Sequence, residues 1–239
     1  MNKSDAIHII TKCAKVYHNE LENRNLLFLF GKTTVPESFE TIFTARNYLH
    51  LTGVATNIHS VDFYKKCLNG RIDSEDFAFA SDGTTALKLQ VLPQLMRVYQ
   101  TAKMIGNYDL SRITLHTEKL AGNVSACMGF IRNPECSNYY IPNTALKEDI
   151  RNISIHPAMR VIAILRKMRK ELTYSEFCYT AKGVEIQSLC QYTPIRQKLS
   201  YSLRKEEEHT PVNDYLMQLS HEKEQNRHQA KNNGCDFER

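Results

Sequence analysis

The spacing of apolar residues predicts a helix and then two strands at the start of the chain. After Ser4, a good helix-capping residue, five apolar residues recur at helical spacing: Ile7, Ile10, Ala14, Tyr17 and Leu21. LLFLFG (26–31) has five consecutive apolar residues, which predict a buried strand. SFETIFTARNYLHLTG (38–53), whose alternation is only partly of period two, predicts a second strand that runs through residue 53.

The next part of the chain predicts helices. SVDFYKKCLNG (60–70) predicts a short helix with an apolar inner face, which Ser60 caps and Gly70 ends. Residues 82–106 fit both a helix and a strand, and Pro93 interrupts them. We favour a broken helix that ends at Gly106.

From residue 112 the pattern favours strands. RITLHTEKL (112–120), ACMGFIR (126–132) and YYIP (139–142) are separated by turn residues and predict a three-stranded meander. VIAIL (161–165) is apolar without alternation, as in a strand buried on both faces, and EFCYT (176–180) predicts a last strand. Residues 181–220 predict a helical extension, and the polar residues 221–239 a disordered tail.

Composition narrows the class of protein. Of 239 residues, 42% are hydrophobic and 24% charged, which is typical of a soluble globular chain. The net charge of +5 favours polyanionic partners only weakly. Seven scattered cysteines without a CxxC pair indicate reduced thiols, and no apolar run has the length of a membrane span or signal peptide. We therefore expect a cytoplasmic protein with no membrane partner.

Several common motifs are absent from the sequence. It contains no GxxxxGK[ST], GxGxxG, HExxH or GxSxG, and its nine glycines leave little room for a phosphate-binding loop. No pair of Cys or His residues has the short spacing of a zinc site. We accordingly expect neither a metal nor a cofactor.

Polar residues within the second predicted strand are the first candidates for chemistry. Alternate residues of a strand share a face, so Arg46, Tyr48, His50 and Thr52 would form one row. Imidazole can donate or accept a proton near neutral pH, and a guanidinium can bind phosphate with two hydrogen bonds. A polar face in contact with water explains the row equally well.

Three further groups are weaker candidates. His116 and Glu118 would share one strand face, with Thr117 and Lys119 on the other, yet solvated strands often show this pattern. Tyr139 and Tyr140 can stack on bases, although tyrosines more often cover the edge of a core. The basic run at 166–170 is typical of a solvated segment, or else lies beside a groove that attracts phosphate.

Six segments carry a resemblance to a known family: ARNYLHLTGV, DGTTALKLQVLPQLM, AKMIG, LHTEKLAGN, MGF and YYIPNTALKEDIR. They resemble the fourth group of phage nuclease-like domains of the barnase, EndoU, colicin E5/D and RelE class, from about residue 5 to about residue 168. The resemblance implies an α+β domain over residues 1–180. In it, N-terminal helices pack on a curved, mainly antiparallel β-sheet, and the gene belongs to a phage or other mobile element.

The resemblance also implies metal-independent cleavage of RNA, in which the ribose 2′-hydroxyl attacks the adjacent phosphate. Such a toxin-like enzyme needs an acid, a base and a cation. His50 is the candidate acid or base, Arg46 and Lys119 would stabilise the phosphate, and Thr52 would orient them. The candidates for substrate contact share hydrogen-bonding or stacking side chains: Tyr48, Thr117, Tyr140 and His116. No second histidine accompanies His50 except His116. The implied partners are RNA and a host or immunity protein.

Two other functions fit the same residues. A strand with His50-Leu51-Thr52 followed by a helix is similar to the start of ADP-ribosyltransferases, which use NAD. Leu51 stands where that family usually has glycine, so we rank this alternative second. The third function is a non-catalytic mobile-element protein that binds and inhibits a host protein.

Overall fold

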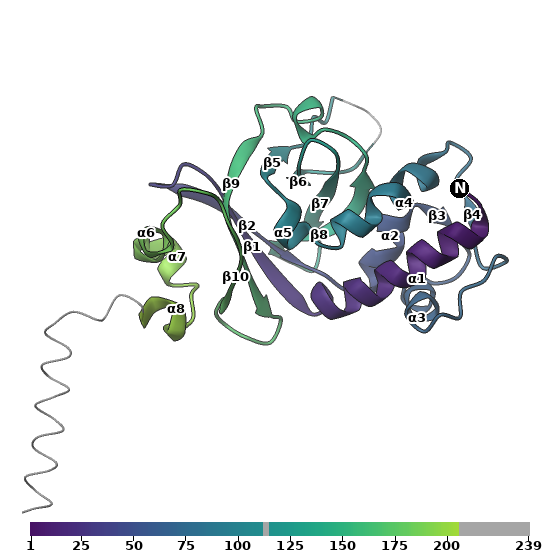
Figure 1. The fold of residues 1–239 in the computed structure, drawn as a ribbon, viewed down its shortest axis with the longest axis horizontal. Coiled ribbons are helices and arrows are strands. Elements are labelled where there is room, and N and C mark those ends of the chain that lie inside the picture. The colour runs from purple at the N-terminus through teal and green to yellow at the C-terminus, as the bar shows by residue number, and fades with distance from the viewer. Residues whose placement is uncertain (112–114, 206–239) are drawn as a thin grey trace, which may run out of the picture.

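The computed structural model describes residues 1–111 and 115–205. The first 101 residues contain six helical elements: α1 (Lys3–Glu20), η1 (Ala45–Asn47), α2 (Tyr48–Thr52), α3 (Ser60–Leu68), α4 (Thr84–Leu95) and α5 (Val98–Thr101). They lie on one side of a large sheet in Figure 1, and α6 (Ile186–Gln191), α7 (Thr193–Arg196) and α8 (Tyr201–Lys205) lie on the other. In these residues, no helix is both long and apolar enough to cross a bilayer.

The sheet is mixed and has eight strands in the order β1-β2-β8-β7-β6-β5-β9-β10. Their bounds are β1 (Arg24–Gly31), β2 (Pro36–Ile42), β5 (Met104–Asn107), β6 (Lys119–Gly122), β7 (Cys127–Asn133), β8 (Cys136–Leu146), β9 (Met159–Met168) and β10 (Glu176–Thr180). β1 also pairs with β9, so the ladder of strands closes on itself. Neighbouring strands are antiparallel except β2 and β8, which are parallel and pair at only two positions. A separate two-stranded sheet joins β3 (Val54–Ala55) to β4 (Ala78–Phe79).

The N-terminal helix forms as its apolar stripe predicts. Ile10, Ala14 and Tyr17 are buried in the main hydrophobic core, where α1 packs against α3 and α4, so the expected inner face is confirmed. The cap is Asn2 rather than Ser4, because the Asn2 side chain accepts a hydrogen bond from the Asp5 backbone N–H. This capping box starts the helix at Lys3, two residues earlier than a cap at Ser4 would.

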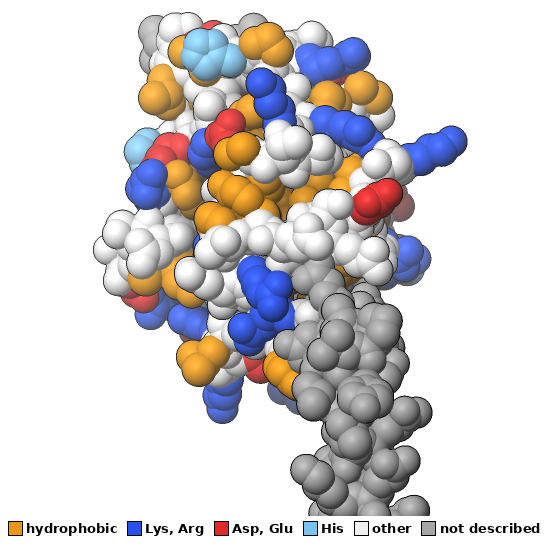
Figure 2. All heavy atoms as spheres, turned by 90° about the vertical axis from the view of Figure 1, so that its left-hand side faces the viewer, with side chains coloured by type: hydrophobic (Ala, Val, Ile, Leu, Met, Phe, Trp, Pro, Cys, Tyr) orange, Lys and Arg blue, Asp and Glu red, His pale blue; other side chains and the backbone are white. Residues whose placement is uncertain are grey.

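β1 separates two hydrophobic cores because both of its faces are buried. Leu26, Phe28 and Phe30 face the core under α1–α5. Leu27 and Leu29 face a second core, which is completed by Leu189 and Cys190 of α6, Ile195 of α7 and Leu199 after α7. Figure 2 views the molecule from the side of α6–α8: apolar side chains gather in the middle of this face, and Lys and Arg side chains surround them. The predicted α+β class is confirmed.

Three predicted elements are wrong in part. The strand predicted through residue 53 ends at Ile42, and η1 and α2 follow it. The broken helix ends at Thr101, and residues 104–107 form β5 instead. Of the strand predicted at 112–120, only its end lies in β6; residues 115–118 lie outside any strand, and 112–114 lie outside the described residues. The predicted tail at 221–239 also lies outside them.

The second core yields a stability prediction. Leu189→Ala removes a fully buried side chain from the contact between α6 and the sheet, so we expect a loss of about 2–5 kcal/mol in the free energy of unfolding. Urea denaturation followed by circular dichroism measures it. The matched control is Leu172→Ala, at a side chain that is 92% exposed, with an expected change within about 0.5 kcal/mol. Equal effects of the two substitutions would contradict this packing.

Candidate active site

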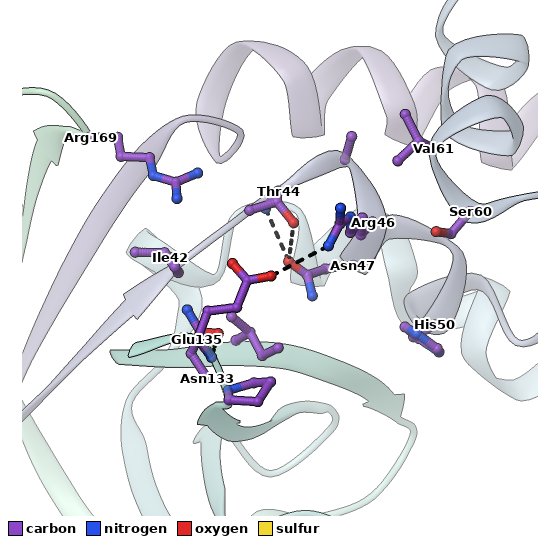
Figure 3. Close-up of a pocket in the computed structure, with 13 residues that line it drawn as sticks. Ile42, Thr44, Arg46, Asn47, His50, Ser60, Val61, Asn133, Glu135 and Arg169 are labelled. Atoms are coloured by element: carbon purple, nitrogen blue, oxygen red, sulfur yellow. Dashed lines mark hydrogen bonds and ion pairs between the residues drawn. The ribbon is translucent and has the colours of Figure 1, made fainter. Parts of the chain in front are cut away.

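Three helical elements, a hairpin and the end of a strand surround a cavity of about 540 Å³, the His50 cavity. Arg46 and His50 contribute to it from η1 and α2, and Ser60 from the start of α3. Asn133 contributes from the end of β7, and Pro134 and Glu135 from the turn between β7 and β8; Arg169 directly follows β9. Figure 3 shows Arg46 and Glu135 directed toward one another, with His50 and Arg169 on opposite sides of them.

Helical rather than extended backbone presents Arg46 and His50 to this cavity. The two residues are four positions apart, which places them on one face of a helix, and both are exposed. Tyr48 and Thr52 lie on the opposite face and are fully buried. The predicted row of four side chains on one strand face is therefore wrong, because the segment turns with helical periodicity.

Hydrogen bonds fix the start of this helical segment. Asn47 Oδ1 accepts hydrogen bonds from the backbone N–H of Thr44 (3.1 Å) and from its hydroxyl (2.8 Å). The Thr44 carbonyl accepts one from the Tyr17 hydroxyl (2.9 Å), and the Tyr48 hydroxyl donates to the Ile10 carbonyl (2.6 Å). Both tyrosines thus tie η1 and α2 to α1. Burial raises the pKa of Tyr17 and Tyr48 well above the usual value, so both hydroxyls stay protonated donors.

The end of α2 is equally constrained. Gly53 ends the helix with a φ of 67°, a left-handed conformation that glycine adopts without strain. A Cβ at Gly53 would lie 2.5 Å from the Lys88 side chain, which crosses the turn to donate a hydrogen bond to the His50 carbonyl (3.1 Å). Burial lowers the pKa of Lys88. The Thr85 hydroxyl also donates to the Gly53 carbonyl (2.5 Å).

The charged groups of the His50 cavity are accessible to a ligand. Arg46 Nη1 lies 3.5 Å from Glu135 Oε1, and these side chains are 70% and 75% exposed. Such an exposed ion pair is weak, so a phosphate can compete for the guanidinium. Among the described residues, the His50 imidazole and the Arg169 guanidinium have no hydrogen-bond or ion-pair partner.

A second cavity of about 630 Å³, the Lys119 cavity, contains Lys119 and Tyr140. It shares no lining residue with the His50 cavity, so the structure does not bring Lys119 together with His50. Burial lowers the pKa of Lys119 and raises that of Tyr140. Tyr140 packs edge-on against Phe39, with ring centroids 5.5 Å apart.

The remaining candidates line neither cavity. Thr52 is buried, and its hydroxyl donates to the Leu49 carbonyl within α2 (2.7 Å). Thr117 is buried, and its hydroxyl donates to Asn143 Oδ1 (3.1 Å). His116 is exposed, and its carbonyl accepts a hydrogen bond from the Asn143 amide. Within the described ranges, no three His, Cys, Asp or Glu side chains are grouped as metal ligands.

Sequence reasoning missed Glu135 and Arg169 as members of this site. Glu135 lies in an Asn-Pro turn, where nothing in the local pattern distinguishes it from a solvated turn residue. Arg169 belongs to the basic run for which a groove was one of two interpretations, and it does line a cavity. The ADP-ribosyltransferase alternative needed His50-Leu51-Thr52 on a strand, and these residues lie in α2.

The fold is thus an α+β domain with an accessible polar cavity. A family model described as phage-Barnase-EndoU-ColicinE5/D-RelE like nuclease4 matches residues 9–183. The chain belongs to this family of nuclease domains, which confirms the resemblance seen in its sequence. Searches of curated proteins and of solved structures found no match to the chain.

The burial of Tyr48 yields a prediction. Tyr48→Phe keeps the ring but removes the hydrogen bond to Ile10, so we expect a loss of about 1 kcal/mol in the free energy of unfolding. Thermal or urea denaturation measures it. Tyr179→Phe is the matched control, since no hydrogen bond of its hydroxyl occurs in the described residues, and it should change stability by less than about 0.5 kcal/mol. A Tyr48→Phe protein as stable as wild type would contradict the proposed anchoring of α2.

Proposed function

We propose that the protein is a metal-independent endoribonuclease of a phage or other mobile element. The observation that carries the proposal is the convergence of His50, Glu135, Arg46 and Arg169 around one accessible cavity. An imidazole, a carboxylate and two guanidinium groups are the functional groups needed for cleavage by the RNA's own 2′-hydroxyl. Membership in a nuclease family supports the reaction class.

Each group has a role in the proposed reaction. The Glu135 carboxylate accepts the proton of the 2′-hydroxyl as its oxygen forms a bond to phosphorus. The His50 imidazolium donates a proton to the 5′-oxygen as the bond between phosphorus and that oxygen breaks. Arg46 and Arg169 stabilise the negative charge that accumulates on the phosphoryl oxygens. The products are a 2′,3′-cyclic phosphate and a 5′-hydroxyl.

The elements around the cavity support this division of roles. Glu135 comes from the hairpin and His50 from α2, so a phosphodiester between them has one group on each side. The Asn133 side chain accepts a hydrogen bond from the Glu135 backbone N–H (3.0 Å), which fixes the hairpin turn. The ion pair with Arg46 orients the carboxylate before RNA binds, and the phosphate then takes over the guanidinium.

The assignment of the proton-transfer groups is tested by cleavage of total RNA in the presence of EDTA. We expect wild-type protein to cut, and His50→Ala and Glu135→Gln each to slow cutting by about 10²–10⁴-fold, because each removes a proton-transfer group. His156→Ala is the matched control, at an exposed histidine that lines neither cavity, and should cut like wild type. Folded wild-type protein that leaves RNA intact would overturn the proposed function.

The role of Arg46 is tested in the same assay. Arg46→Ala should lower the rate by about 10²–10³-fold, as expected when one group that stabilises transition-state charge is lost. Arg71→Ala, at an exposed arginine in the turn after α3, should leave the rate unchanged. Mapping of the cut ends measures the chemistry directly: a 3′-hydroxyl product in place of the cyclic phosphate would refute attack by the 2′-hydroxyl.

Toxicity provides a test in cells. If the enzyme meets RNA in the cytoplasm, the wild-type gene should transform bacteria much less efficiently than the His50→Ala gene. The reason is that uninhibited cutting of cellular RNA arrests growth. Colony counts with equal amounts of plasmid measure the difference. Equal counts, with both proteins expressed, would favour a non-catalytic protein that binds a host partner.

A further inference from the structure

The Lys119 cavity opens where β2 and β8 meet. These two strands pair only at Glu40 with Tyr139 and at Thr41 with Tyr140, and the cavity lies beside this short contact. Lys119 and Arg132 reach it from β6 and β7. Four adjacent strands therefore contribute to one polar hollow, which has about the volume of the His50 cavity.

Most charges in this hollow already have partners. Lys198 pairs with Glu40, whose other carboxylate oxygen accepts a hydrogen bond from the Tyr174 hydroxyl (2.6 Å). Arg132 Nε lies 3.6 Å from Glu118 Oε2, and its guanidinium lies over the Tyr140 ring, 5.2 Å from the centroid. Lys198 and Arg132 thus neutralise the negative charges of Glu40 and Glu118.

Lys119 is the exception. Its ammonium donates a hydrogen bond to Asn107 Oδ1 (2.6 Å), and among the described residues no carboxylate lies within ion-pair distance of it. Burial lowers its pKa, because the charged form loses solvation. Glu37 and Glu118 attract the ammonium only from a longer distance, so an anion in the cavity would supply the direct ion pair that Lys119 lacks, and the site favours a negatively charged ligand.

The other lining groups indicate which anion fits. The Tyr139 ring is half-buried in the cavity wall, and Ser137 and Asn138 add hydrogen-bonding groups beside it. Arg132 is 58% exposed and retains hydrogen-bonding capacity. Cations next to an aromatic ring are the usual means of binding single-stranded nucleic acid, since phosphates contact the cations and bases stack on the ring.

The position of the cavity relates it to the His50 cavity. Ile42 of β2 and Ile141 of β8 line the His50 cavity, and Ser38 to Glu40 and Asn138 to Tyr140 of the same strands line the Lys119 cavity. Ile42 and Ser38 are four residues apart on a strand, which corresponds to about 13 Å. A single RNA strand with its scissile phosphate at His50 can therefore extend into the second cavity.

We propose that the Lys119 cavity is a second RNA subsite, which binds a phosphate at Lys119 and Arg132 and stacks a base on Tyr139. The proposal rests on the proposed function, because it names where the same substrate continues beyond the cleaved bond. Lys119 is then a substrate-binding residue and does not take part in the proton transfers.

Binding of a non-cleavable RNA tests this subsite separately from catalysis. The probe is a fluorescent single-stranded oligoribonucleotide with 2′-O-methyl groups throughout, measured by anisotropy at several salt concentrations. Lys119→Met should weaken binding about tenfold, and should reduce the slope of log affinity against log salt by about 0.7, as expected for one lost phosphate contact on a single strand. Tyr139→Ala should weaken binding by about 5- to 100-fold with no change in slope, because it removes stacking alone.

Lys103→Met is the matched control. Burial also lowers the pKa of Lys103, but its ammonium lies over the Tyr179 ring, outside both cavities. It should bind the probe like wild type, and thermal melting confirms that each variant folds. Wild-type affinity and slope in both Lys119→Met and Tyr139→Ala would overturn the subsite even if the enzyme cuts RNA. The predicted losses of binding in a protein that never cuts RNA would support the subsite and refute only the nuclease activity.

Discussion

The pairing of β1 with β9 is the constraint on which the rest of the structure depends. It joins strands near opposite ends of the described chain in an antiparallel register, with Leu27 opposite Leu165 and Phe28 opposite Ile164. One face of the pair is covered by α1–α5 and the other by α6 and α7. Because both faces are removed from water, a shift of register by one residue would exchange the side chains of the two cores.

This pairing also positions part of the candidate active site. At the last step of the ladder, the Arg169 backbone N–H donates to the Asn23 carbonyl (2.7 Å), and Asn23 has a left-handed φ of 59°. Arg169 is thereby held at the edge of the His50 cavity by strand pairing, while its side chain remains exposed. The fold thus brings a cation from the end of the sheet to a histidine on a short helix.

The sequence predicts the strongly periodic elements well and the short ones poorly. The apolar stripe of α1 and the continuous apolar runs of β1 and β9 are long enough to determine their type. The stretch around His50 is too short for a helical repeat to be distinguished from a strand repeat. Residues four positions apart share a face in both structures, since strand side chains alternate every two residues and helix side chains repeat about every 3.6. Arg46 and His50 therefore share a face under either interpretation, whereas Tyr48 and Thr52 lie on that same face only if the segment is a strand. The place of Glu135 in the site depends on how the hairpin of β7 and β8 packs against η1 and α2, and no local sequence pattern predicts this packing.

The basic run at 166–170 explains why charge alone does not identify the site. Arg166 is 12% exposed and binds Glu20 and Glu176 at 2.7 Å each. Burial alone would lower the pKa of Arg166, but the two carboxylates raise it above the usual value, and the residue joins α1 to the sheet. Arg169, three positions along, has no such partner in the described structure. A cation that is already paired with carboxylates must give up those ion pairs to bind a phosphate, which offsets the gain. A cation without such pairs binds a phosphate with no such loss. The ion pairs seen in the structure therefore distinguish Arg166, which has two carboxylate partners, from Arg169, which has none among the described residues. The same criterion, the absence of a carboxylate within ion-pair distance in the described part of the chain, identifies Lys119 in the second cavity.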